Sequence, residues 1–168
     1  APKPAPKPYV VELRAVGMTF QGPAEIPSGW TTFRFVNASN MIHFALIDVP
    51  PAGITAEAMS ETVMQPFQDA MDAMNAGDEE AVNAAFATIP DWIGELGRNG
   101  GPGLLSAGRT GQATVYLEPG YYIIECYVKS DGVFHTTPPA EGQLGMVMGL
   151  TVTDETSGAP EPEANLNL

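Results

Sequence analysis

The order of apolar and polar residues predicts strands over most of the chain. Apolar side chains recur at every second position, the period of a half-buried strand, in residues 9–16, 30–38, 42–49, 112–117, 121–128 and 145–153. These segments are rich in aromatic and β-branched residues. Turn residues separate them: residues 23–29 predict one turn, and Pro119 and Gly120 suit a type II turn. The pattern therefore predicts an all-β protein in which each strand buries one face.

The pattern changes between residues 51 and 109, where apolar residues recur at spacings of three and four. One stripe of this kind falls on residues 56–75 and consists of Met59, Val63, Phe67, Met71 and Met74. Thr55 is a suitable N-cap for this helix and Asp78 for a second one, while Pro66 predicts a kink or break in the first. We expect a helical insertion of about residues 51–109 whose methionines pack against the strands. A thioether surface for Cu(I) is the alternative use of these methionines.

Both ends of the chain lack the pattern of a packed core. Residues 1–8 are rich in proline, which predicts an extended, flexible tether, and residues 154–168 predict a flexible acidic tail. The domain is therefore expected to span residues 9–153. A first residue of alanine suits a mature periplasmic or secreted protein after removal of a signal peptide, although the boundary of a cut chain would look the same.

The net charge narrows the classes of partner. The sequence has 7 Lys and Arg against 20 Asp and Glu, a formal charge of −13 at pH 7. Nucleic-acid binding requires basic side chains that replace phosphate counterions, so this composition argues against it. A basic protein partner suits the charge, and so does a plain solvated surface. No run of about 18 apolar residues is present, so no membrane span is expected.

The candidate chemistry is concentrated in four side chains. Cys126 is the only cysteine, and His43 and His135 are the only histidines. A thiolate, two imidazoles and the thioether of Met146 form a soft ligand set that suits a trigonal His2Cys copper site with a weak axial methionine. The alternative for Cys126 is a small buried apolar residue, and for His43 a hydrogen bond within the core. Zinc is a further ion that the thiolate and imidazoles could hold.

Two stretches of the sequence resemble the cupredoxins. The first, VNASNMIHFALI, carries His43. The second, LEPGYYIIECYV, carries Cys126 and is followed by a loop with His135 and by GMVMGLTV, which begins with Gly145 and Met146. The resemblance implies a cupredoxin-like Greek-key β-sandwich or barrel, with the α-helical insertion between the first-histidine strand and the cysteine strand.

The resemblance also implies one mononuclear, type 1 (blue) copper site. Cys126 would supply the dominant thiolate, His43 and His135 would complete the trigonal plane, and Met146 would be the distant axial ligand. Ten residues, 136–145, separate His135 from Met146, a longer gap than most cupredoxins have, so Met148 is the alternative axial ligand. In the family the exposed edge of the second histidine is the electron port, which implies that role for His135 here.

The function expected from this resemblance is the transfer of single electrons between extracytoplasmic redox partners, such as a basic cytochrome or a membrane redox complex. One alternative is a copper-handling protein without redox exchange. Another is a structural or accessory subunit of a larger complex with the metal site empty or altered. We do not expect an enzyme, because no helix N-terminus activates Cys126 and no further histidine is present for a second copper. The oligomeric state is left open.

Overall fold

Strand β3 connects two β-sheets that enclose a common core. The computed structural model describes residues 7–140 and 142–163. The strands of the first sheet are β1 (Val10–Val16), β2 (Thr19–Gln21), β3 (Glu25–Asn37) and β6 (Thr110–Leu117). Those of the second are β4 (Leu46–Val49), β5 (Gly97–Arg98), β7 (Gly120–Glu125) and β10 (Val147–Thr156). The C-terminal part of β3 pairs with β1 and β6, and its N-terminal part pairs with β10.

The core lies between these sheets and follows the predicted alternation. On β1 the buried side chains are Val11, Leu13 and Ala15, and on β7 they include Tyr122 and Ile124. On β1 the polar residues between them, Glu12 and Arg14, face outward, as the period of a half-buried strand requires, whereas on β7 the residue between them is the buried Ile123. The predicted fold class is therefore confirmed: the chain has a mostly β, cupredoxin-like fold with a helical insertion after His43 and before Cys126.

Several predicted strand boundaries are wrong, and three of them show the physical reason or the extent of the error. The sequence suggested a turn at residues 23–29, but β3 begins at Glu25 and passes through Gly29, whose φ of +107° lets the strand bend from one sheet to the other. Regular β4 begins only at Leu46, because the segment before it pairs with the irregular residues 99–105. Strand β10 extends three residues beyond the predicted end at 153, to Thr156. Residues 1–6 of the predicted tether and 164–168 of the predicted tail lie outside the described residues.

The helical insertion begins with one continuous helical stretch of three segments. These are α1 (Ala56–Met59), the π-helical η1 (Ser60–Met64) and α2 (Gln65–Ala76). Thr55 caps the N-terminus by accepting a hydrogen bond of 3.2 Å from Ala58 N. The predicted break at Pro66 is absent. Instead Gln65 N donates to Ser60 O in the wider π register, immediately before the residue that has no N–H to donate.

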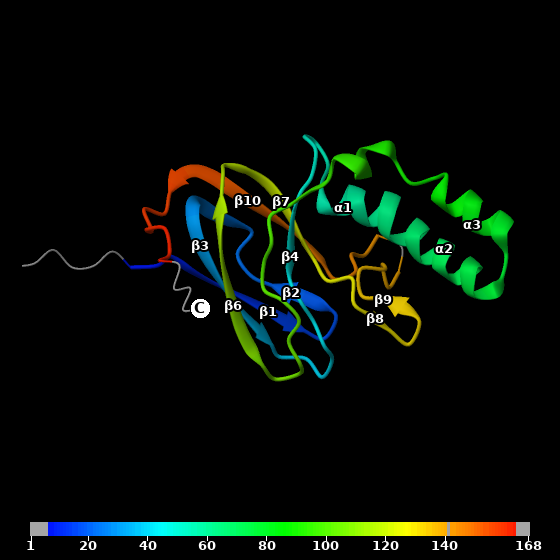
Figure 1. Cartoon of the computed structure of the whole chain (residues 1–168), viewed down its shortest axis with the longest axis horizontal. Helices are drawn as coiled ribbons and strands as arrows, with labels where there is room; N and C mark the ends of the chain where they lie inside the picture. The colour runs from blue at the N-terminus through cyan, green and yellow to red at the C-terminus, as the bar shows by residue number, and fades with distance from the viewer. Residues whose placement is uncertain (1–6, 141, 164–168) are drawn as a thin grey trace, which may run out of the picture.

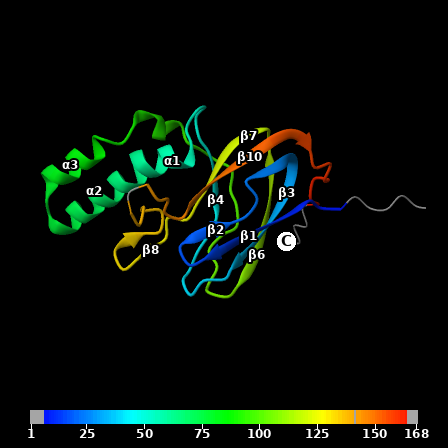
Figure 2. The same cartoon turned by 180° about the vertical axis from the view of Figure 1, so that it is seen from behind.

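A second helix and one further turn complete the insertion. Asp78 caps α3 (Glu79–Phe86) by accepting a 3.0 Å bond from Ala81 N, as predicted, and η2 (Asp91–Glu95) is a short 3-10 turn. Figure 1 shows these helices together at one end of the sandwich, and the view from behind in Figure 2 shows the same arrangement.

The start of the insertion covers the outer face of the second sheet. Met59, Val63 and Met64 form a second core cluster with Ile123 of β7 and Val147 of β10. The packing role predicted for the methionine stripe is therefore confirmed for its first turns. Beyond them the stripe leaves the sheet, and Phe67 and Met74 are exposed.

A small hairpin stands apart from both sheets. Strands β8 (Lys129–Ser130) and β9 (Val133–Phe134) pair only with each other. The hairpin lies beside α2 in both views (Figures 1 and 2). It belongs to the loop between Cys126 and His135, so the insertion and this loop are in contact.

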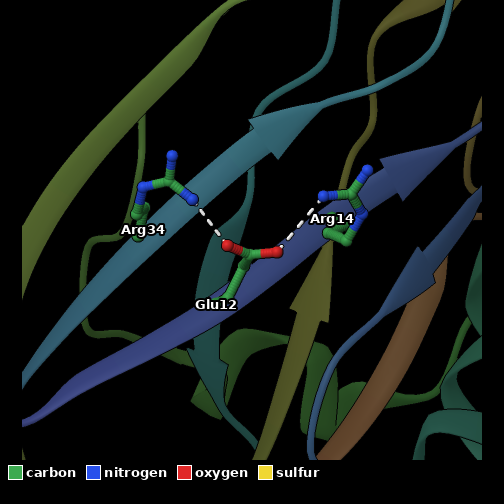
Figure 3. A network of polar contacts seen from close by, with 3 residues as sticks. All are labelled: Glu12, Arg14 and Arg34. Atoms are coloured by element: carbon green, nitrogen blue, oxygen red, sulfur yellow. Dashed lines mark hydrogen bonds and ion pairs between the residues drawn. The ribbon is translucent and has the colours of Figure 1, made fainter.

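The outer surface of the first sheet carries a small ion network. Glu12 lies between Arg14 and Arg34 and pairs with both guanidinium groups (Figure 3). All three side chains are more than two-fifths exposed, so each pair contributes at most about 1 kcal/mol.

Among the described residues, no helix has the length and apolar character needed to cross a bilayer.

Candidate metal centre

His43, Cys126 and His135 converge at one end of the core. Cys126 Sγ lies 3.6 Å from His43 Nδ1 and 3.7 Å from His135 Nδ1, and the two Nδ1 atoms are 3.1 Å apart. All three residues are at most 1% exposed. Side chains separated by 83 and 92 positions in the sequence thus present one sulfur and two nitrogen atoms to a single point.

These three atoms fit a transition-metal ion. The point equidistant from all of them lies about 2 Å from each, which is close to the usual length of a bond between zinc and a histidine nitrogen. Without an ion, two imidazole nitrogens at 3.1 Å share at most one hydrogen between them. One thiolate and two imidazoles in a trigonal arrangement are the donor chemistry of a blue-copper centre.

Met146 is joined to two of these residues through its backbone. Its N–H donates to His135 O at 2.7 Å, and its carbonyl accepts from Cys126 N at 3.1 Å. The side chain is fully buried in the same core cluster as Cys126. The buried His43–Cys126–His135 cluster together with Met146 is typical of a type 1 copper site. Met148 packs at the edge of the core, where its methyl group lies beside Gly22.

Each donor residue is positioned by a different segment of the backbone. His43 forms an isolated two-residue bridge with Leu105, through hydrogen bonds of 3.1 and 2.8 Å. Asn37 supports this bridge: its fully buried amide donates to Leu105 O at 2.9 Å and to Met41 O at 2.7 Å. Cys126 follows the last residue of β7, and His135 follows β9. The cysteine was expected within its strand, and it lies one residue beyond it.

Burial keeps all three donors uncharged in the metal-free protein. Burial and the neighbouring His135 lower the pKa of His43 to about 4, and burial lowers the pKa of His135. Burial also raises the pKa of the Cys126 thiol. Both imidazoles are therefore neutral at pH 7, the form that binds a metal ion, whereas the thiol must release its proton when it binds one.

The expectation of an exposed His135 edge is wrong. His135 is 1% exposed, and its Nε2 lies 2.9 Å from the hydroxyl of Ser130 in the β8–β9 hairpin. The Ser130 side chain of the hairpin thus lies at the ring edge that the sequence suggested as an electron port. His43 Nε2 is also buried, and within the described part of the chain it has no hydrogen-bond partner.

A pair of buried carboxyl groups next to the centre was not anticipated. Asp48 is fully buried and Glu125, the neighbour of Cys126, is 3% exposed. Arg98 lies 3.5 Å from Asp48 and 3.8 Å from Glu125. Burial and the charge of Asp48 raise the pKa of Glu125 to about 8, and burial raises the pKa of Asp48. The sequence did contain a signal for this pair, because Asp48 and Glu125 are each the one acidic residue on the outer face of an otherwise apolar strand.

Gly145 allows the backbone next to Met146 to pack closely against the backbone that follows His135. A Cβ atom at this position would overlap the carbonyl group of Thr136 and lie 2.7 Å from Thr137 O, and these atoms belong to backbone that cannot rotate away. Gly145→Ala is therefore expected to lower the free energy of unfolding by about 1–3 kcal/mol, the cost of overpacking, and to weaken metal binding by displacing Met146 and the residues after His135. Urea unfolding and metal titration check this.

Gly103→Ala is the matched control, since an added Cβ there meets nothing within 4 Å and the residue has no positive φ. Equal effects of the two substitutions would contradict the steric account of Gly145.

Comparisons with known proteins give structural relatives only. No protein-family model matches the chain, and no curated protein sequence matches it. Auracyanin B is 21% identical, with a TM-score of 0.46, over 90% of this chain and 92% of that one. Auracyanin A, a "blue" copper protein from the green thermophilic photosynthetic bacterium Chloroflexus aurantiacus, is 22% identical, with a TM-score of 0.45, over 88% and 100%. A blue copper oxidase from Nitrosomonas europaea is 14% identical, with a TM-score of 0.39, over 90% and 46%.

The fold and the geometry of the centre agree with the resemblance that the sequence motifs suggested. The two sheets joined by β3 form the scaffold, and the three donors of the centre lie together at one end of it. This chain therefore combines a mostly β, cupredoxin-like fold with a buried cluster of His43, Cys126 and His135 beside Met146 that is typical of a type 1 copper site.

Proposed function

We propose that this protein binds one copper ion with His43, Cys126, His135 and Met146 and transfers single electrons. The observation that carries the proposal is the convergence of Cys126 Sγ and the two Nδ1 atoms within 3.7 Å of one another in a fully buried place. Copper would supply a one-electron Cu(II)/Cu(I) couple. A trigonal sulfur and nitrogen donor set is a compromise that both oxidation states tolerate, so little rearrangement accompanies the transfer.

The protein's own contribution is to fix the donors and exclude water. His43 is held by its bridge to Leu105, and Cys126 and His135 are both hydrogen-bonded to the backbone of Met146. Because none of these contacts depends on an ion, the donors are in place before a metal arrives. Such preorganisation favours fast electron transfer, since no loop must move when the charge of the site changes.

The partner and the location follow from the same proposal. We propose a redox protein partner with a basic surface, for example a cytochrome or a membrane redox complex, because the chain carries a formal charge of −13. We place the protein in the periplasm or outside the cell, where its single thiol needs the protection that burial and a metal would give. We propose no enzymatic activity, since the two histidines of the sequence are both used by one centre.

A copper-handling protein without redox exchange is the second candidate. The same buried donors favour it, because a closed soft site also retains Cu(I). Reversible electrochemistry separates the two functions. The proposed function predicts a reversible one-electron wave for the copper-loaded protein, whereas loss of copper on reduction or oxidation would overturn electron transfer.

Met146→Leu is expected to raise the reduction potential while copper stays bound. The loss of an axial thioether destabilises Cu(II) relative to Cu(I), and each tenfold change in their relative affinity shifts a one-electron potential by ~59 mV. Voltammetry of the copper-loaded variant measures this shift. Met148→Leu is the matched control, because Met148 packs at the edge of the core beside Gly22. A shift in the Met148 variant alone would show that the axial assignment is wrong.

A further inference from the structure

Gln68 joins the helical insertion to the loop that carries His135. The residue lies on α2 and is 4% exposed. Its Oε1 accepts from Phe134 N at 2.9 Å and from the Thr137 hydroxyl at 3.3 Å. Its Nε2 donates to Gly132 O at 3.1 Å and to Asp72 Oδ1 at 2.8 Å. The amide therefore uses all of its donors and acceptors, and three of its four partners bracket His135 in the sequence.

The hairpin that receives these bonds has little support of its own. Each strand has two residues, and neither pairs with the main sheets. Its turn residues Asp131 and Gly132 both have positive φ, as in a tight hairpin turn. An isolated two-stranded hairpin is marginally stable in water. Its apolar contact with the insertion runs through Phe67 and Phe134, whose ring centres are 5.5 Å apart.

The hairpin in turn sets the orientation of the His135 ring. Ser130 in β8 places its hydroxyl 2.9 Å from His135 Nε2, and His135 N donates to Val128 O at 2.8 Å. A proton on Nε2 that is donated to Ser130 leaves the Nδ1 lone pair directed at the centre shared with Cys126 and His43. Displacement of the hairpin would thus rotate the ring or change its tautomer.

We propose that Gln68 is a positioning residue for the metal centre, and that the helical insertion serves to hold the His135 loop in its ligating geometry. The contact of α2 with the loop runs through the Gln68 amide to the hairpin, then through Ser130 to the imidazole. This assigns a role to residues that a copper site alone does not require. Only the copper-dependent part of the test below rests on the proposed function.

The test compares Gln68→Met with Gln65→Met. Methionine keeps the length and helix propensity of glutamine and removes its hydrogen bonds. Gln65 is the matched control, because it lies on the same helix and makes the same type of bond, from Nε2 to Asp69 Oδ1 at 2.7 Å. In the metal-free protein we expect amide exchange at Phe134 to become at least about tenfold faster in Gln68→Met, because the N–H loses its acceptor, and the ring nitrogen resonances of His135 to shift.

The copper-loaded protein gives the second readout. Gln68→Met is expected to change the copper hyperfine splitting and the reduction potential, and Gln65→Met to leave both at the wild-type values. Ser130→Ala keeps the Gln68 contacts and removes only the partner of His135 Nε2, so it should shift the His135 resonances without faster exchange at Phe134. Even if Gln68→Met does not fold, Ser130→Ala still tests whether the hairpin orients the His135 ring through Ser130.

Each contrary result has a distinct meaning. Equal Phe134 exchange and equal His135 resonances in the two glutamine variants would overturn the proposal. Unchanged His135 resonances in Ser130→Ala would also overturn it, because the ring would then be held by other contacts. If the wild-type protein binds no copper, the proposed electron transfer fails, while the metal-free measurements still decide whether Gln68 positions His135.

Discussion

Cys126→Ser is expected to abolish the intense visible colour of the copper-loaded protein and to weaken copper binding more than any other single substitution. The colour of a blue-copper site comes from the bond between copper and thiolate, and the chain has no second cysteine to replace it. Loss of an outer-shell partner typically costs 10–100-fold in metal affinity, so loss of this donor should cost more than about 100-fold. Visible absorption and copper titration measure the two effects.

The fold should survive this substitution. Serine is slightly smaller than cysteine, and its buried hydroxyl would lie beside the Nδ1 atoms of His43 and His135; it costs about 1–3 kcal/mol only if it bonds to neither of them. Thermal unfolding of the metal-free variant is the control that separates a lost ligand from a lost fold. A variant that keeps both its fold and the charge-transfer band would exclude Cys126 as the copper ligand.

Glu125→Gln is expected to stabilise the metal-free protein at pH 8. The folded-state pKa of Glu125 is raised from 4.5 to about 8, so between these values the unfolded chain gives up a proton that the folded protein retains. Stability from this group is therefore present at low pH and is lost as the pH rises toward 8. Each tenfold difference in proton affinity corresponds to about 1.4 kcal/mol, so the wild-type protein is expected to lose more than this amount over the range. Glutamine has no carboxyl proton to lose.

The difference between variant and wild type isolates this effect. His43 acts in the opposite direction, because its pKa is lowered to about 4 and its contribution to stability increases with pH up to about 6.5. Urea unfolding at pH 5 and pH 8 should show the advantage of Glu125→Gln growing with pH. Glu118→Gln, at an exposed carboxylate beside the same strand, is the control. An advantage of Glu125→Gln that is independent of pH would contradict a retained proton.

The sequence predicted the elements of the centre because their signals are local. Alternation along residues 121–128 placed Cys126 on the same face as Tyr122 and Ile124, and these residues do share the core. The chemistry of the donors then restricted the other ligands to two histidines. The helical insertion was also visible, because Thr55 and Asp78 cap its helices and the spacing of apolar residues changes there.

The features that were missed depend on contacts between distant segments. Asp48 and Glu125 lie on neighbouring strands, and only the pairing of Ile47 with Ile124 places both carboxyl groups on the same outer face. His135 is covered because its hairpin is bonded to Gln68, 67 residues before it in the chain, and no periodicity reveals that bond. The bend of β3 at Gly29 was read as a turn, since glycine marks both features in a sequence.

The most direct test of the copper centre is to add Cu(II) to the metal-free wild-type protein and to record its visible absorption and EPR spectra. Cys126 Sγ and the Nδ1 atoms of His43 and His135 predict one bound copper per chain, an intense thiolate-to-copper band and a narrow copper hyperfine splitting. A protein that stays colourless, or that binds copper with the spectrum of a tetragonal nitrogen and oxygen site, would contradict a His2Cys copper centre in this chain.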